Sequence, residues 1–273
     1  MSPLTFTLEK RPALPVDLSP LIPERLHGKK IAEIKAIPLA SGNQTREVGE
    51  LFKITGRDPS HIVIHRSSAK LYRVGAEMTT GLIEIHGTVG DLLGQDMDGG
   101  SITVRGNTGQ WMGSGMKGGV IQISGNTGDF LGAARPGDAE GMSNGTIIVT
   151  GQAGDRVGDG MRRGTIVIKG DAGHYCGSRM LAGTILVLGG IGTSPGLGMR
   201  RGTLVLASRP SHIAATFNSC GILKVEFLRL LFKQLSSMHN RLRFLKDFGP
   251  EAERFVGDMA LGGKGELLVL TLT

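Results

Sequence analysis

Five basic side chains in equivalent positions of the sequence could hold carboxylates. Each follows a methionine and precedes a glycine in a recurring Met-x-x-Gly segment, and the five are Lys117, Arg162, Arg163, Arg200 and Arg201. Lysine and arginine bind carboxylates through charge-assisted hydrogen bonds, which are stronger than neutral ones. If the segments stack as successive coils, the two arginine pairs lie two coils apart, about 10 Å along the stack. We therefore predict a site for an anionic ligand, and the alternative is a solvated basic edge that deters aggregation.

Motifs that look catalytic are explained by the repeat in which they occur. Gly192 to Gly196 reads Gly-Thr-Ser-Pro-Gly, like a nucleophile elbow around Ser194, but both glycines belong to the repeat and no strand-to-helix turn follows. The seven histidines lack the spacing of metal ligands. Cys176 is predicted to be a core residue, because its column holds Leu93, Met112, Leu131 and Val157. No column places a base beside a nucleophile, so we predict neither a catalytic nor a metal site.

A period of 19 residues must position these side chains. Seven methionines begin equivalent segments, at steps of 19, 19, 26, 19, 19 and 19 residues. A glycine follows each methionine after three residues, and then a short run in which Ile, Leu or Val alternates with other residues. The methionines are Met78, Met97, Met116, Met142, Met161, Met180 and Met199.

The period predicts an all-β fold, a single-stranded right-handed β-helix (solenoid) of 19-residue Gly-rich coils. Alternation with period two predicts one buried strand face and one face in water. A unit of 19 residues is too short for a strand with a crossover helix, but it is long enough for one coil of a solenoid. Glycine fits the corners, where φ is positive and neighbouring backbones approach closely. The methionine and Ile/Val columns would fill the interior.

The flanking sequence predicts caps for the two ends of the solenoid, where strands would otherwise be unpaired. We predict an N-terminal capping segment over 1–60, the β-helix over 61–208, and a C-terminal helix and tail over 209–273. Within these, a helix is predicted over Lys29–Ile37 and an amphipathic helix over Phe217–Phe248. Two early segments resemble degenerate coils, Leu51–Thr55 and His61–His65.

Two further features suggest surfaces for recognition. Leu92, Trp111, Phe130 and Tyr175 share one column, which predicts either a protein interface or packing beneath the terminal helix. The single irregular step inserts seven residues within Ala133–Met142, and solenoids often carry such loops on their recognition face.

Composition restricts the remaining classes. The 273 residues carry a formal net charge of +7, but no basic run or nucleic-acid-binding signature accompanies it, so we predict no nucleic-acid partner. The beginning of the chain has no apolar signal core, and no stretch is apolar enough to cross a membrane. Two cysteines cannot form a disulfide framework. A cytoplasmic protein with no membrane partner is expected.

These residues resemble the GXGXG-repeat family. The family comprises the C subunits of formylmethanofuran dehydrogenase and of the bacterial formyltransferase/hydrolase complex, and the C-terminal domain of the large chain of glutamate synthase. The resemblance is strongest over Gly75 to Leu206. The insert with Pro136-Gly137-Asp138, the opening Thr-Phe-Thr-Leu-Glu-Lys-Arg-Pro and the pair Asp17-Leu18 are similar to the C subunits in particular.

The resemblance implies a scaffold role in the one-carbon metabolism of methylotrophy. Formyl groups would move between tetrahydromethanopterin and a methanofuran-like carrier, and the catalysts would be an amidohydrolase-like subunit and a formyltransferase subunit of the same complex. No cofactor is expected on this chain itself, although the five basic side chains of the Met-x-x-Gly segments, which we call the basic stripe, would suit the carrier's anionic glutamyl tail. The alternatives are the C subunit of a tungsten or molybdenum formylmethanofuran dehydrogenase and a solenoid adaptor unrelated to one-carbon metabolism.

Overall fold

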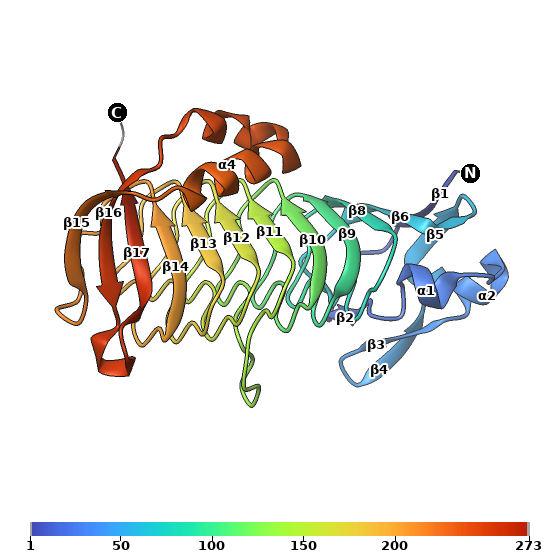
Figure 1. Cartoon of the computed structure of the whole chain (residues 1–273). Coiled ribbons are helices and arrows are strands. Elements are labelled where there is room, and N and C mark those ends of the chain that lie inside the picture. The colour runs from blue at the N-terminus through green and yellow to red at the C-terminus, as the bar shows by residue number, and fades with distance from the viewer. Residues whose placement is uncertain (1, 272–273) are drawn as a thin grey trace.

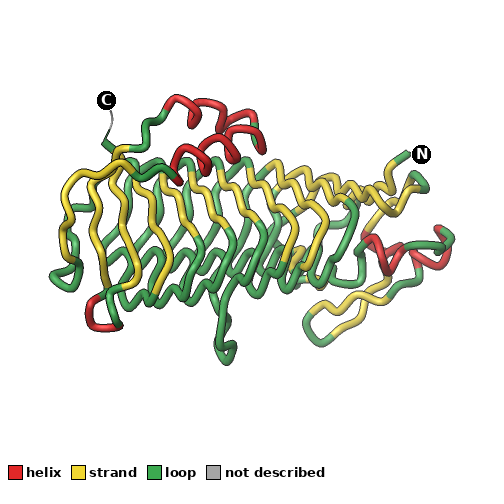
Figure 2. Tube along the Cα trace, viewed as in Figure 1, coloured by secondary structure: helices red, strands yellow, loops and turns green. Residues whose placement is uncertain are grey.

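A computed structural model gives the structure of residues 2–271. Strands make up most of the regular structure, and one long sheet contains thirteen of them (Figures 1 and 2). The helices are few and lie near the two ends of the chain. The expectation of an all-β fold is therefore confirmed in its coarse form, a mostly β chain built around an open sheet.

The seven central strands each belong to one repeat and pair in parallel with the next. Ile83 pairs with Ile102, and Ile102 with Ile121. On another side of each repeat a parallel bridge joins Thr108 to Thr127, and later repeats continue the row. The chain thus returns beside itself once per repeat. The strands are β8 (Leu82–Gly87), β9 (Asp98–Arg105), β10 (Gly118–Ile123), β11 (Thr146–Val149), β12 (Thr165–Ile168), β13 (Thr184–Val187) and β14 (Arg201–Leu206).

Columns of apolar side chains fill the interior of the stacked repeats. The seven repeat methionines are all 0% exposed. Each methionine methyl group occupies the space that a side chain would need at the glycine of the following repeat. A Cβ on Gly100 would lie 2.4 Å from Cε of Met78, and a Cβ on Gly119 would lie 2.7 Å from Cε of Met97. The Met-x-x-Gly spacing therefore reflects packing between successive repeats.

The N-terminal residues form a cap at one end of the sheet. β1 (Pro3–Leu8) lies between β5 (Phe52–Thr55), which is antiparallel to it, and β6 (Asp58–Ser67), which is parallel to it and to β8. The expected coil at His61–His65 is thus part of the parallel ladder, whereas the one at Leu51–Thr55 is wrong. The other elements are β2 (Val16–Asp17), α1 (Pro23–Leu26), α2 (Ile31–Lys35), β3 (Pro38–Ser41), β4 (Gln44–Glu47), α3 (Val48–Leu51) and β7 (Leu71–Tyr72).

The C-terminal residues differ from the expected single helix over Phe217–Phe248 and tail. Residues 218–224 form a strand, in which Gly221 has a φ of +74°, and extended backbone at His239 separates the helix proper from a 3-10 helix. Two further strands replace the tail, and the last pairs in parallel with β14. The elements are β15 (Asn218–Lys224), α4 (Phe227–Met238), η1 (Asn240–Asp247), β16 (Glu251–Gly257), η2 (Met259–Leu261) and β17 (Lys264–Leu270).

Helix α4 and η1 cover the outer face of the later strands (Figure 1). Alternation predicted water at this face, but the outward side chains there are at most 1% exposed, because they pack against Leu228, Phe232 and Leu235 of α4. These outward side chains are Ile148, Val167, Leu186 and Val205. Across the sheet the order is β15-β16-β17-β14-β13-β12-β11-β10-β9-β8-β6-β1-β5, and a smaller sheet has the order β4-β3-β2-β7.

Candidate anion-binding groove

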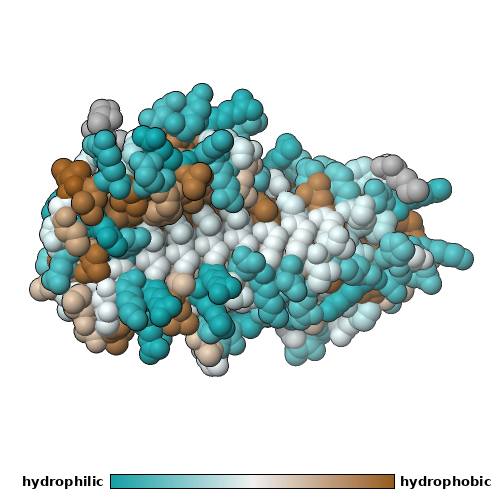
Figure 3. Space-filling view, viewed as in Figure 1, coloured by the Kyte–Doolittle hydropathy of each residue, from teal (hydrophilic) through white to brown (hydrophobic). Residues whose placement is uncertain are grey.

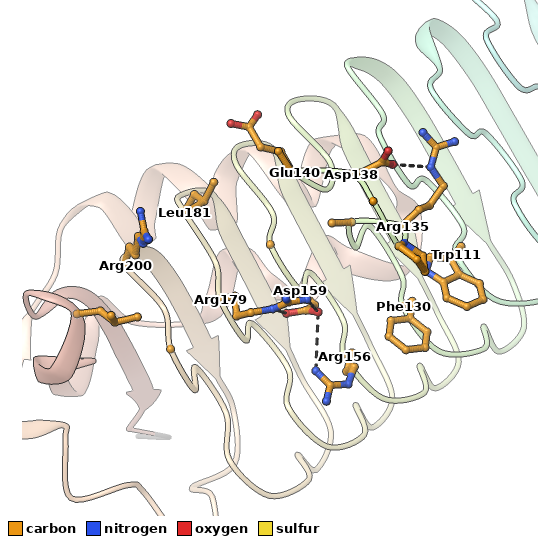
Figure 4. Close-up of a pocket in the computed structure, with 17 residues that line it drawn as sticks. Trp111, Phe130, Arg135, Asp138, Glu140, Arg156, Asp159, Arg179, Leu181 and Arg200 are labelled. Atoms are coloured by element: carbon orange, nitrogen blue, oxygen red, sulfur yellow. Dashed lines mark hydrogen bonds and ion pairs between the residues drawn. The ribbon is translucent and has the colours of Figure 1, made fainter.

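A groove of about 770 Å³ lies where the insert leaves the repeats. Insert residues from Ala134 to Glu140 form part of its lining, and side chains from successive repeats form the rest (Figure 4). Four guanidinium groups line it, those of Arg135, Arg156, Arg179 and Arg200. The groove is therefore the place where the insert, the aromatic column and one of the predicted basic residues meet.

A column of flat side chains runs along the groove side of the repeats. The rings of Trp111 and Phe130 stack with centroids 4.6 Å apart and planes 6° apart. The next position holds Arg156, whose guanidinium carbon lies 4.9 Å from the ring centroid of Tyr175. Both rings of the stacked pair line the groove, and neither belongs to the cluster under α4. Packing beneath the terminal helix, one of the two predicted explanations of this column, is therefore wrong.

The column owes its direction to a left-handed backbone. Trp111, Phe130, Arg156 and Tyr175 have φ values of 53°, 62°, 58° and 59°. L-residues rarely adopt this conformation, which costs them about 1–2 kcal/mol each. Because the same conformation recurs in successive repeats, it is imposed by the way each repeat turns its corner and aims these side chains outward.

A buried carboxylate anchors two of the guanidinium groups. Asp159 is 1% exposed, and its Oδ1 accepts hydrogen bonds of 2.8 Å from both Ser178 Oγ and Arg179 Nε. Arg179 also donates through Nη2, and Arg156 Nη1 lies 3.8 Å from Asp159 Oδ2. The hydrogen bonds to Asp159 raise the pKa of Arg179 above its ordinary value. Asp159 therefore positions two cations at the groove wall, and each keeps donors free.

Ion pairs hold the insert against the repeats. Arg135 donates to Asp138 within the insert over 2.6 Å, and to Asp96, two repeats earlier, over 3.1 Å. At the other end of the insert, Glu140 accepts two hydrogen bonds of 2.9 and 2.8 Å from Arg162. The insert therefore forms a wall of the groove that ion pairs fix to the repeats at both of its ends.

The five predicted basic residues are all exposed, but the structure does not gather them at one point. Backbone hydrogen bonds from Arg162 to Met142 and from Arg200 to Met180 place both residues in the same column of repeats. Arg200 lines the groove, and Arg162 borders it through Glu140. Within residues 2–271, no carboxylate lies within 4.0 Å of the charged groups of Lys117, Arg163, Arg200 and Arg201.

Sequence reasoning missed three groove residues: Arg156, Arg179 and Asp159. Arg156 occupies the aromatic column, and Arg179 occupies the column of Asp96, so neither belongs to the Met-x-x-Gly stripe. The breaks in otherwise regular columns were the available signal. Of the groove arginines, Arg200 belongs to the basic stripe. Arg156 and Arg179, which Asp159 holds, belong to the two other columns.

The two side chains that resemble nucleophiles lie in different surroundings, since Cys176 is buried and Ser194 is half-buried. Cys176 is 1% exposed, and burial raises its pKa to about 12, so it stays a neutral thiol. Ser194 makes no side-chain hydrogen bond within residues 2–271. Over the same range, no group of three or more His, Cys, Asp and Glu side chains is arranged to hold a metal ion, and no helix is long and apolar enough to cross a membrane.

Comparison with known proteins gives relatives of one kind. No protein-family model matches the chain. The C subunit of the tungsten-containing formylmethanofuran dehydrogenase 2 of Methanococcus maripaludis is 34% identical over 96 residues, which are 34% of this chain and 35% of that protein. The C subunit of the formyltransferase/hydrolase complex Fhc of Methylorubrum extorquens is 39% identical over 89 residues, 32% of this chain and 34% of that protein. The matched segment thus spans about a third of these curated relatives.

A likeness in structure extends over nearly the whole chain. A chain in the crystal structure of the formyltransferase/hydrolase complex FhcABCD from Methylorubrum extorquens, determined in complex with methylofuran, is 37% identical with a TM-score of 0.90. The match covers 98% of this chain and 100% of that one. The chain therefore belongs to the family formed by the C subunits of the formyltransferase/hydrolase complex and of formylmethanofuran dehydrogenase.

Proposed function

We propose that this chain is a non-catalytic structural subunit of a cytoplasmic formyltransferase/hydrolase complex. The complex moves formyl groups between tetrahydromethanopterin and a methanofuran-like carrier. The observation that carries the proposal is the likeness over 98% of the chain to a chain of FhcABCD. The other subunits, an amidohydrolase-like one and a formyltransferase, perform the chemistry, and neither cofactor is bound by this chain alone.

The scaffold is a right-handed β-helix whose interior is closed to substrates. Two observations support this fold. Each repeat adds one strand to the parallel ladder from β6 to β17, and a second row of parallel bridges joins the repeats on another side. The methionine and isoleucine columns of the repeats are buried and fill the interior. A rigid rod of this kind suits a subunit that holds catalytic partners at fixed separations.

The groove and its basic stripe help to hold the carrier's anionic tail. Arg200 has no carboxylate partner among residues 2–271, and Asp159 orients Arg156 and Arg179 at the same wall. Guanidinium groups bind carboxylates in a two-pronged geometry, so spaced arginines suit a chain of carboxylates. Lys117, Arg162, Arg163 and Arg201 extend the positive surface on either side.

Reconstitution tests the proposal. The other three chains of the complex are purified with and without this chain, and formyl transfer and hydrolysis are measured for each mixture and for this chain alone. We expect no turnover by this chain alone and full activity only in the four-chain mixture. Turnover of a formyl substrate by the isolated chain would overturn the non-catalytic role, and full assembly and activity without it would overturn the structural one.

A second candidate is the C subunit of a formylmethanofuran dehydrogenase, which the relatives from Methanococcus maripaludis and Methanothermobacter wolfeii favour. The two candidates differ in their redox chemistry. A complex isolated through this chain would contain tungsten or molybdenum in the second case and none in the first. Elemental analysis of the purified complex, with an assay for formyl oxidation, separates them.

A further inference from the structure

Exposed apolar side chains gather at one end of the molecule. Nine large hydrophobic side chains are exposed in the described residues, and eight of them follow residue 196. The ninth, Leu14, lies in the N-terminal cap. Figure 3 shows the brown, hydrophobic surface concentrated at the C-terminal end of the sheet. Four of the eight lie on α4, on η1 and on the face of β15 toward α4, and we call them the C-terminal surface: Leu223, Phe227, Leu230 and Phe244.

The strand within this surface is the outermost strand of the long sheet. β15 pairs with β16 on one side and has no strand on the other within residues 2–271. All seven of its residues are exposed. At the opposite end of the sheet, β5 alternates buried and exposed residues and packs into the N-terminal cap. Native proteins usually cover or blunt an edge of this kind, because its free N–H and C=O groups accept another strand. β15 is therefore the more exposed of the two edge strands, and a bulge between Ser219 and Ile222 interrupts its pairing with β16.

The same surface is strongly basic. Residues 224–247 hold six lysines and arginines against two carboxylates, which is more than half of the chain's formal net charge of +7. Lys233, Arg243 and Lys246 are exposed, and none has a carboxylate within 4.0 Å in the part of the chain that the structure describes. Lys233 follows Leu230 by three residues, so the two share a face of α4. Apolar anchors and unpaired cations thus stand side by side.

We propose that the C-terminal surface docks an acidic subunit of the same complex, with an extended segment of that subunit along the free edge of β15. Apolar side chains of the partner cover Leu223, Phe227 and Leu230, and its carboxylates face Lys233, Arg243 and Lys246. This inference rests on the proposed function. The charge of the surface selects an acidic partner rather than a second copy of this basic chain. The relative in FhcABCD is itself one chain of an assembly, which favours a protein partner over a lipid surface.

The test compares three forms of the chain, each co-expressed with the other three chains of the complex. Leu230→Glu changes a side chain that is 72% exposed, so its thermal unfolding should match that of the native chain. Leu14→Glu, at 43% exposed, is the matched control at the other end. We expect Leu230→Glu to bind at least one partner about tenfold more weakly or worse, because the carboxylate is brought against an acidic, apolar contact. Leu14→Glu should assemble normally.

A photocrosslinking benzoylphenylalanine at position 230 identifies what lies on the surface. A cross-link to an Asp- and Glu-rich segment of one of the other three chains supports the proposal. It is overturned if Leu230→Glu assembles as the native chain does, if the cross-link joins two copies of this chain, or if the native chain binds phosphatidylcholine–phosphatidylserine vesicles through Leu230 while assembly is unaffected. If the native chain fails to assemble with the other three chains at all, the proposed function fails and this inference fails with it.

Discussion

Adding a single methyl group at Gly158 tests how tightly successive repeats interlock. Gly158 has a φ of +65°, and a Cβ there would lie 2.5 Å from Cδ1 of Ile185 in β13. Gly160 has nearly the same φ, +69°, but its Cβ would lie at ordinary contact distances, 3.4 Å from the Cβ of Ala134 and 3.9 Å from the backbone nitrogen of Gly141. The two substitutions to alanine therefore carry the same backbone penalty and differ in the clash.

The expected magnitudes follow from these contacts. The left-handed backbone costs alanine about 1–2 kcal/mol, so Gly160→Ala should lower the free energy of unfolding by that amount. Gly158→Ala adds overpacking, worth about 1–3 kcal/mol more. Ile185→Val removes the clashing Cδ1 and costs about 0.5–1.5 kcal/mol alone. Because Gly158→Ala and Ile185→Val act on one contact, the double variant should be more stable than the sum of the single losses predicts.

Urea unfolding followed by circular dichroism measures all four variants against the native chain. The predicted order of stability is native, Gly160→Ala, then Gly158→Ala, with partial recovery in Gly158→Ala/Ile185→Val. Equal losses for the two alanine variants, or strict additivity in the double variant, would refute the claim that glycine is required here by packing between repeats.

Three further predictions concern the groove and the core. Charge reversal of Arg162, Arg163, Arg200 and Arg201 to glutamate should raise the Michaelis constant for the carrier in the assembled complex and reduce the salt dependence of carrier binding. Reversal of the exposed Lys53 in the N-terminal cap should change neither quantity. Unchanged Michaelis constants in the first variant would refute carrier binding at the stripe. In thermal unfolding, Asp159→Ala should destabilise the chain by about 1–3 kcal/mol, because it leaves Ser178 and Arg179 without their acceptor. Asp138→Ala breaks a more exposed ion pair with Arg135 and should cost less than about 1 kcal/mol in the same measurement. A thiol reagent at pH 8 should modify Cys220 but not Cys176 in the native chain and both in urea, because burial raises the pKa of Cys176 to about 12; modification of both thiols without urea would contradict the packed interior.

The repeat made the central part of the fold predictable from sequence. The methionine of one repeat packs against the glycine of the next, as Met78 and Gly100 show, so both residue types are required in every repeat. The period is therefore visible in the amino-acid sequence. The strand registers follow from the same spacing. The C-terminal elements have no such constraint. Leu223 fits the helical periodicity across Phe217–Phe248, yet it lies in β15 and pairs with Ala252.

The position of α4 did have a signal. Outward strand residues change from Glu84, Thr103 and Gln122 in the early repeats to Ile148, Val167, Leu186 and Val205 in the later ones. A strand can carry apolar side chains on both faces only where both faces are buried. The change from polar to apolar outward residues therefore marks where a covering helix begins. Alternation within a single repeat does not contain this information, which appears only when the outward residues of successive repeats are compared.

The groove could be predicted only in part. The basic residues are visible at equivalent positions of the repeat, and the insert is visible as a break in the period. The insert and Arg200 line the groove, and Arg162 borders it through Glu140. The pairing of Arg135 with Asp96 and of Arg179 with Asp159 depends on how the insert folds back and on which corner side chains face one another. Spacing along the chain does not specify those directions.

Native mass spectrometry of the assembly purified through a tag on this chain, after co-expression with the other three chains of the complex, tests the central claim most directly. A single species that contains all four chains in fixed proportion is the predicted result. A chain that purifies alone, while the other three form an active complex without it, would contradict the account.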